Sequence, residues 1–168
     1  NDALSSLVAV LQRRDSEFTG LAHMNDLLQT CETQDEAYRI IALKSADLFA
    51  GRSGCLAVSH PSGRYLETVA RWGDEMIVED VFPMVDCWAL RRGRPHEVDD
   101  PRTSLLCTHF VRPPSRGYRC LPLMVQGETL GVLYLDAASQ PDHRSGQHQL
   151  ALAAGEAIKL SLANLRLR

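Results

Sequence analysis

The chain has 168 residues, of which 45% are hydrophobic and 23% charged, and this composition predicts one ordinary globular domain. A formal net charge of −3 at pH 7 gives no reason to expect nucleic acid as a partner. No apolar run reaches the roughly 18 residues of a membrane span, and no leader precedes a cleavage site, so we expect a cytoplasmic segment without membrane contact. The five cysteines are odd in number and form no CxxC pair, which favours free thiols in a reducing compartment.

The first predicted element is a helix over residues 2–29. Apolar residues recur at alternating steps of three and four from Leu4 to Leu28, with Asn25 at one a position, and this is a heptad seam. The seam indicates either an amphipathic helix on its own domain or a partner-facing coiled-coil segment. We favour the second interpretation and treat residues 1–29 as an N-terminal signalling and dimerisation helix.

A second helix and a hairpin follow. Thr33 can cap a helix that runs to about Ala50, with Glu36 as its capping-box acid. Gly54–His60 and Tyr65–Trp72 are predicted strands, and the Pro61-Ser62-Gly63 turn between them predicts a hairpin.

Residues 74–118 show little regular patterning and hold most of the prolines, which is typical of a functional or mobile segment. They contain one helical candidate, Cys87–Arg92, with Asp86 as the expected N-cap and Gly93 as its stop signal.

A second hairpin and a final helix complete the chain. Cys120–Val125 and Thr129–Asp136 are predicted strands joined at Gly127, and a polar loop over 139–145 leads to a helix that starts near Gly146. This helix has two apolar faces and no stop signal, so we expect it to pack on a partner and to continue into a further domain. The order of elements predicts an α+β fold, an antiparallel sheet with helices packed on it.

Several stretches resemble a GAF domain, the small-molecule sensory module of bacterial signalling proteins. They extend from about Asp26 to Arg168 and include Asp35-Glu36-Ala37, Arg71-Trp72-Gly73, Leu121-Pro122-Leu123 and Leu130-Gly131-Val132-Leu133. The most specific stretch runs from Asp86-Cys87-Trp88-Ala89-Leu90-Arg91 to His96 and is followed by Cys107-Thr108-His109. It is similar to GAF domains that stand before a GGDEF diguanylate cyclase.

The resemblance implies a GAF-like, PAS-related fold. Its central antiparallel sheet would carry the N- and C-terminal helices on one face and a ligand pocket on the other, under residues 74–118. Residues 30–168 would be the sensory domain, ending in a C-terminal signalling helix. The resemblance further implies a non-enzymatic module that forms a homodimer through its end helices. It would regulate a C-terminal output domain, a GGDEF cyclase or a histidine kinase.

The ligand-binding residues are expected in the segment that carries the specific part of the resemblance and most of the unusual polar and sulfur side chains. They are Cys87, Trp88, Arg91, His96, Cys107 and His109. No catalytic motif is found, and we assign no catalytic residue.

Cys107 and His109 are the sharpest pair, because residues two apart on an extended segment point to the same face. Together with Cys87, His96 or Cys120 they could bind zinc or haem iron, or form an activated nucleophile. Their spacing matches no standard zinc pattern. A buried thiol beside a histidine bonded to backbone is the simpler interpretation.

We therefore expect no metal, haem or bilin cofactor. Cys-x-His departs from the Cys-His of bilin-attaching GAF domains, and the cysteine pattern of the GAF-fold methionine sulfoxide reductases is not evident.

Arg91, Arg92 and Arg94 form a basic cluster that could hold an anionic ligand or pair with Glu97, Asp99 or Asp100.

The function favoured by the sequence is therefore a sensor of a small molecule or of redox state. The alternatives are a ligand-free dimerisation module and thiol redox chemistry at Cys107. An open polar cavity lined by Arg91 or His109 favours ligand sensing, and a pocket packed shut favours dimerisation alone. A low-pKa, exposed Cys107 favours the thiol chemistry.

Overall fold

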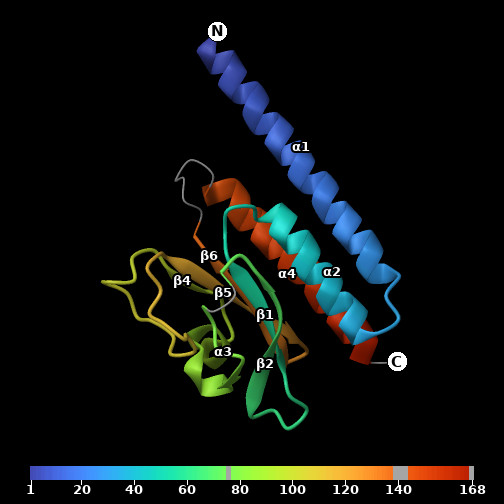
Figure 1. Ribbon diagram of the computed structural model, residues 1–168, viewed down its shortest axis with the longest axis vertical. Helices are drawn as coiled ribbons and strands as arrows, with labels where there is room; N and C mark the ends of the chain where they lie inside the picture. Colours follow the sequence, from blue (N-terminus) through green and yellow to red (C-terminus); the bar gives the residue numbers. More distant parts are fainter. Residues whose placement is uncertain (75–76, 138–143, 167–168) are drawn as a thin grey trace.

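The computed structural model describes residues 1–74, 77–137 and 144–166 (Figure 1). The elements in chain order are α1 (Asp2–Gln29), α2 (Gln34–Leu48), β1 (Gly54–Ser59), β2 (Tyr65–Trp72), β3 (Val81–Pro83), the short 3-10 helix η1 (Met84–Asp86), α3 (Trp88–Arg92), β4 (His96–Val98), β5 (Tyr118–Val125), β6 (Glu128–Asp136) and α4 (Arg144–Arg166).

The strands form one antiparallel sheet in the order β3-β2-β1-β6-β5-β4. Its centre is the pairing of β1 with β6, which joins the two predicted hairpins. Gln126 and Gly127 form the two-residue turn between β5 and β6 with φ values of 52° and 80°. Positive φ at both positions is the geometry of a type I′ turn, so the predicted hairpin is confirmed.

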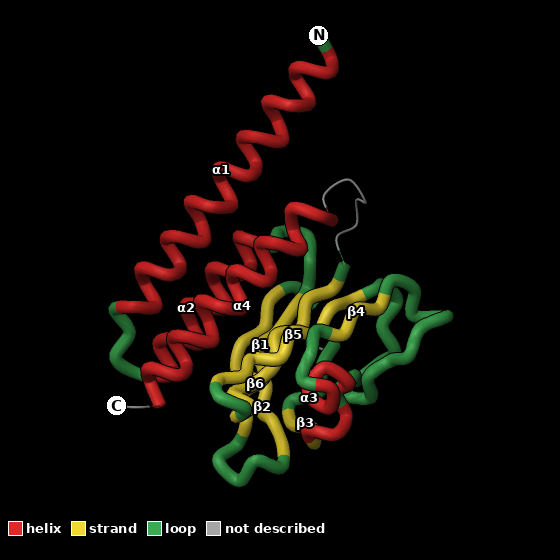
Figure 2. Tube along the Cα trace, turned by 180° about the vertical axis from the view of Figure 1, so that it is seen from behind, coloured by secondary structure: helices red, strands yellow, loops and turns green. Residues whose placement is uncertain are grey.

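The fold has layers on both sides of the sheet (Figures 1 and 2). α2 and α4 cover one face, and α1 lies on the outer side of these two helices. α3 and the segments around it cover the opposite face. The expected α+β architecture, with the end helices on one side and the segment 74–118 on the other, is confirmed.

Each face of the sheet has its own hydrophobic core. The helix-side core lies under α2 and α4 and includes Ile41, Leu121, Leu133, Ala154 and Ile158. The loop-side core lies under α3 and its flanking segments and includes Cys55, Phe82, Leu90, Val132 and Tyr134. Because neighbouring residues of β6 such as Val132 and Leu133 fall into different cores, both faces of that strand are buried.

α1 is a 28-residue helix that packs on the domain only near its C-terminal end. Its buried residues are Met24 and Leu28, whereas every residue from 1 to 16 is exposed. The heptad residues Leu4, Leu7 and Leu11 are 54–60% exposed. The predicted bounds of this helix are confirmed, and its seam lies open to solvent along the first half.

Three local expectations are revised. β3 and β4 are edge strands of three residues inside the stretch expected to be irregular. Asp86 does not cap α3: Cys87 occupies the N-cap without a side-chain capping bond. α4 begins at Arg144, while most of the predicted loop 139–145, together with Leu167 and Arg168, lies outside the described residues.

Of the helices in the described ranges, none has both the length and the apolar content needed to cross a membrane.

Candidate functional site

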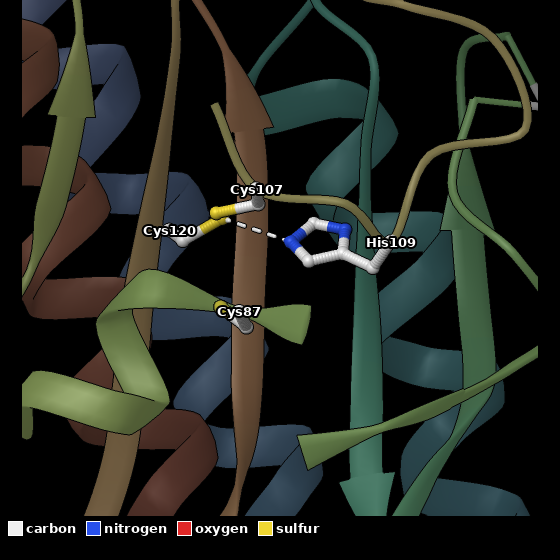
Figure 3. Close-up of side chains that lie close together, drawn as sticks. All are labelled: Cys87, Cys107, His109 and Cys120. Carbon is white, nitrogen blue, oxygen red and sulfur yellow. Dashed lines mark hydrogen bonds between the residues drawn. The ribbon is translucent and has the colours of Figure 1, made fainter. Parts of the chain in front are cut away.

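Four side chains from three parts of the chain meet in the loop-side core (Figure 3). The Sγ atoms of Cys87, Cys107 and Cys120 and a ring nitrogen of His109 all lie within 4.8 Å of one another. The four residues have exposed fractions of 0%, 4%, 0% and 1% in that order. We refer to them as the thiol–imidazole cluster.

The sheet provides one member of the cluster. Cys120 lies on β5, where alternate side chains point to opposite faces. Tyr118 and Cys120 therefore enter the loop-side core, whereas Leu121 and Leu123 enter the helix-side core.

The irregular segment provides the other three members and is fixed by backbone hydrogen bonds on both sides. Thr108 N–H donates to the carbonyl of Asp86 at 2.9 Å, and Glu79 N–H donates to the carbonyl of His109 at 3.0 Å. Cys107 and His109 are buried while Thr108 between them is exposed, so the expectation that they share one face is confirmed. These bonds hold the Cys107 segment against Cys87 at the start of α3.

The hydrogen bonds of the cluster favour a single thiolate at Cys107. The backbone N–H of Trp88 donates to the Cys107 Sγ at 3.4 Å. Hydrogen bonds from the thiols of Cys120 and Cys87 lower the pKa of Cys107 far below the usual thiol range. The bond to Cys107 in turn raises the pKa of Cys87 to about 12, and it also raises the pKa of Cys120. Since like charges in a buried site repel one another, ionisation of Cys107 disfavours ionisation of the other two thiols.

His109 directs one ring nitrogen at the sulfurs. Its Nε2 lies 3.7 Å from the Cys120 Sγ (Figure 3). Phe82 and Phe110 pack against the ring with centroid distances of 4.9 Å and 4.5 Å. Within the described residues, the buried Nδ1 has no hydrogen-bond partner. Nε2 is therefore the ring nitrogen that faces the sulfur atoms of the cluster.

The other predicted ligand-binding residues contribute no side-chain atom to the cluster. His96 is buried on β4, and its Nε2 is 2.8 Å from the carbonyl oxygen of Leu105. Trp88 is half-buried, and the guanidinium of exposed Arg91 stacks on its ring at 4.1 Å. Cys120 belongs to the cluster but was predicted only as an additional metal ligand. The sequence signal that could have placed Cys120 at the site is its position two residues after Tyr118 on a strand, which puts both side chains on the same face.

Two of the three acidic residues expected to pair with the arginine cluster, Glu97 and Asp100, pair with other residues. Glu97 contacts Arg119 at 3.1 Å and His148 at 3.6 Å, and Asp100 contacts Arg102 at 3.2 Å.

A cavity of about 530 Å³ opens beside the loop-side core. It is lined by Gly51, Ser53, Asp74, Ile77, Arg112, Pro113, Pro114, Ser115, Arg116, Tyr134 and Asp136. This volume is within the range of small-molecule sites. None of the six predicted ligand-binding residues lines this cavity, so their role as ligand contacts stays a prediction.

The cavity and the cluster share an aromatic boundary. The Phe110 ring lies 5.5 Å from that of Tyr134, which lines the cavity, and 4.5 Å from that of His109.

Comparison with known proteins identifies the family. The GAF domain model matches residues 33–163. No curated protein matches the chain. The GAF domain of A. aeolicus Nlh2 in an inactive state aligns with a TM-score of 0.71 at 14% identity, covering 92% of this chain and 99% of that one.

Two further solved structures share the fold. The GAF domain of an Acinetobacter phosphoenolpyruvate-protein phosphotransferase aligns with a TM-score of 0.68 at 10% identity, covering 90% of this chain and 96% of that one. The free methionine-R-sulfoxide reductase of Neisseria meningitidis, solved with its substrate, aligns with a TM-score of 0.65 at 15% identity, covering 88% and 91%. At these identities the likeness concerns the fold.

Proposed function

Because this chain belongs to the GAF domain family, we propose that it is the cytoplasmic sensory domain of a larger bacterial signalling protein and has no catalytic activity of its own. The observation that carries this proposal is the placement of two unusual features on opposite sides of one sheet. The thiol–imidazole cluster lies on the loop side, and the exposed heptad seam of α1 lies on the helix side. The cluster suits a site that receives a signal, and the exposed seam suits a surface that passes the signal to another domain.

The strand β5 links the two sides. Cys120 is a member of the cluster, and its neighbour Leu121 packs in the helix-side core with Ala154 and Ile158 of α4. A change at the cluster that displaces β5 therefore shifts α4, because close-packed cores transmit small displacements. The input is a change in the state of the cluster or a small molecule in the adjacent cavity.

The output requires a partner for α1 and α4. We propose a parallel homodimer through these helices, with a GGDEF diguanylate cyclase domain, or alternatively a histidine kinase, following α4. The input then favours one arrangement of the paired helices over another, which is a population shift between two dimer states. In the alternative without an input, the same seam serves only for dimerisation.

The experiment compares the full-length protein with a seam variant, Leu7→Asp with Leu11→Asp, and a matched control, Ser16→Asp, on the opposite side of α1. The readout is cyclic di-GMP made from GTP, or autophosphorylation for a kinase. We expect the seam variant to change output about tenfold or more, which corresponds to about 1.4 kcal/mol, and the control to leave it unchanged. Wild-type output from a monomeric seam variant would contradict the proposal.

A second candidate function, a thiol redox sensor, is favoured by three sulfur atoms that lie within 4.8 Å of one another, although Cys107 is only 4% exposed and so lacks the exposure expected of a reactive thiol. The Cys107 thiolate attacks hydrogen peroxide, releasing hydroxide and forming a sulfenic acid. The thiol of Cys120 or Cys87 then attacks that sulfur and gives its proton to the departing hydroxide, so that a disulfide forms and water leaves. In total, two thiols lose two electrons and two protons while the peroxide becomes two waters.

The second candidate is tested by peptide mapping after peroxide treatment. We expect a Cys107–Cys120 or Cys107–Cys87 disulfide that dithiothreitol reverses. Oxidation confined to Cys31 or Cys55 would contradict it. An assay with free methionine-R-sulfoxide and dithiothreitol checks the enzymatic alternative, for which we expect no turnover.

A further inference from the structure

We infer that Cys87, Cys107, His109 and Cys120 form a closed Zn²⁺ site. The inference deepens the proposed function, because it identifies the chemistry of the same cluster, but zinc binding can be measured without any signalling. It replaces the expectation of no metal drawn from the sequence spacing. The pleat of β5 brings Cys120 to the cluster, and the hydrogen bonds around α3 bring Cys87 to it. Neither placement can be predicted from the spacing of these residues along the chain.

The distances fit a tetrahedral ion. Zn–S bonds of about 2.3 Å and Zn–N bonds of about 2.0 Å separate the ligand atoms of a tetrahedron by about 3.5–3.8 Å. His109 Nε2 and Cys120 Sγ are 3.7 Å apart, and all four ligand atoms lie within 4.8 Å of one another. Closing the set around one ion needs movements of about an ångström or less, which rotations of the side chains provide.

The donor set selects the metal. Three thiolates and one imidazole are soft ligands that favour Zn²⁺ over Mg²⁺ or Ca²⁺, which prefer oxygen. All four residues are buried, and four protein ligands fill a tetrahedral shell, so no position remains for water or substrate. The arrangement is that of a structural or regulatory zinc site and not of a catalytic one.

The surroundings also suit a metal thiolate. The Trp88 N–H points at the Cys107 sulfur, and backbone N–H groups are common outer-shell partners of ligating thiolates. Nε2 of His109 lies toward the sulfurs, and in the tautomer with the proton on Nδ1, which has no hydrogen-bond partner within the described residues, its lone pair would point at them. A divalent cation would also allow all three thiols to ionise in a buried site, where they otherwise repel one another.

Zinc would act as an ordering device. Its ligands come from the start of α3, from the segment that holds Cys107 and His109, and from β5. One ion would therefore connect α3 and the segment that holds Cys107 and His109 to the central sheet. Since metal binding couples to folding, occupancy would control how firmly these two segments are held.

The test begins with the unaltered 168-residue chain, so that it does not depend on variants that fail to fold. Metal analysis of the purified protein, followed by loading with Zn²⁺ after chelation, is expected to give one zinc per chain. X-ray absorption at the zinc edge is expected to give three sulfur neighbours at about 2.3 Å and one nitrogen at about 2.0 Å. Co²⁺ loading is expected to give the intense visible bands of a tetrahedral ion with thiolate charge transfer.

Variants then assign the ligands. Cys107→Ser and Cys120→Ala are expected to lower Zn²⁺ affinity at least a hundredfold. Cys55→Ser is the matched control, because Cys55 is buried in the same loop-side core at 3% exposure but lies outside the cluster. It is expected to keep wild-type affinity and the cobalt spectrum.

Absence of tight zinc, an oxygen-rich shell, or equal losses for Cys55→Ser and Cys107→Ser would overturn the inference. These outcomes differ from failure of the proposed function. A protein that binds zinc through the four ligands but whose output ignores the α1 seam keeps the metal site and loses the signalling proposal. A protein that binds no zinc but whose seam variant changes output keeps the signalling proposal and loses the metal site.

Discussion

Trp88 holds the Cys107 loop through two different atoms: its backbone N–H donates to the Cys107 Sγ at 3.4 Å, and its indole Nε1 donates to the Leu106 carbonyl at 3.2 Å. The first bond orients the thiolate, and the second fixes the backbone that carries it. Trp88 is thus a positioning residue for the thiol–imidazole cluster, although it contributes no ligand atom to the cluster.

The first prediction concerns this indole bond. Trp88→Phe keeps the backbone N–H and an aromatic ring but leaves the Leu106 carbonyl without its donor. We expect a loss of about 1 kcal/mol in the free energy of unfolding and about tenfold weaker Zn²⁺ binding. Urea denaturation and competition with a chelator measure the two effects.

Trp72→Phe is the control for the first prediction. The Trp72 Nε1 is buried and has no hydrogen-bond partner within the described residues, and its ring lies in the helix-side core. This variant is expected to leave zinc affinity unchanged. A tenfold loss in both variants would mean that general loosening of the fold, and not the indole bond, weakens the site.

The second prediction concerns assembly. In the 168-residue chain, Leu7→Asp with Leu11→Asp places charges on a seam that the proposed dimer buries. Each buried leucine contributes about 1.5–3 kcal/mol, so the dimer dissociation constant should rise at least a hundredfold. Sedimentation velocity across micromolar concentrations measures it. Ser16→Asp adds a charge away from the seam and should leave the dimer intact, and a wild-type protein that is strictly monomeric would contradict the prediction.

The third prediction concerns Arg52, which is buried between the sheet and α4. Its Nε donates to the backbone carbonyl of Asp136 at 2.7 Å, and its Nη1 donates to the side chain of Gln147. Burial lowers the pKa of this guanidinium to about 10, so it stays charged at neutral pH.

Arg52→Met removes both bonds and leaves the Asp136 carbonyl without its donor. We expect a loss of about 2–4 kcal/mol in the free energy of unfolding, because hydrogen bonds to charged groups are the stronger ones. Arg39→Met on the exposed face of α2 should change stability by no more than about 0.5 kcal/mol. Equal effects would show that Arg52 contributes no more than a surface residue.

The fourth prediction compares two glycines. A Cβ on Gly131 of β6 would overlap the backbone carbonyl oxygen of Ala57 on the paired strand, so Gly131→Ala should separate the central strands and cost several kcal/mol. A Cβ on Gly155 of α4 would make ordinary contact with Leu123 at 3.7 Å. Gly155→Ala should therefore stabilise the helix by about 0.5–1 kcal/mol. Thermal unfolding gives both signs, and stabilisation by Gly131→Ala would be incompatible with this sheet register.

Local signals in the sequence were sufficient for most of the fold. The Thr33 cap is present, with its Oγ1 accepting from Glu36 N–H at 3.2 Å, and the hairpin turns fall at the predicted glycines. β3 and β4 were missed because strands of three residues at a sheet edge depend on pairing with β2 and β5. A strand that short carries almost no pattern of its own.

The candidate site was only partly predictable. Cys107 and His109 follow from their spacing on one extended segment, and Cys87 from its motif. That the start of α3 lies beside Cys120 is a tertiary relationship, which no spacing rule contains. Arg91 was included because it belongs to the stretch that carries the specific resemblance, and in the structure the helical turn buries Ala89 and Leu90 and leaves Arg91 exposed.

The geometry of α1 has a mechanical consequence. Its contacts with the domain begin at Gly20, which lies against Leu48 of α2, and at about 1.5 Å per residue the helix extends about 27 Å from there to Asp2 (Figure 1). The helix can therefore act as a lever that pivots near Gly20. A tilt of about 10° at that point moves the far end by about 5 Å, by the same helical rise. The packed part from Gly20 to Leu28 is about 12 Å long, so a movement of about 1 Å at Leu28 displaces the far end by about 2 Å, which changes how two such helices meet.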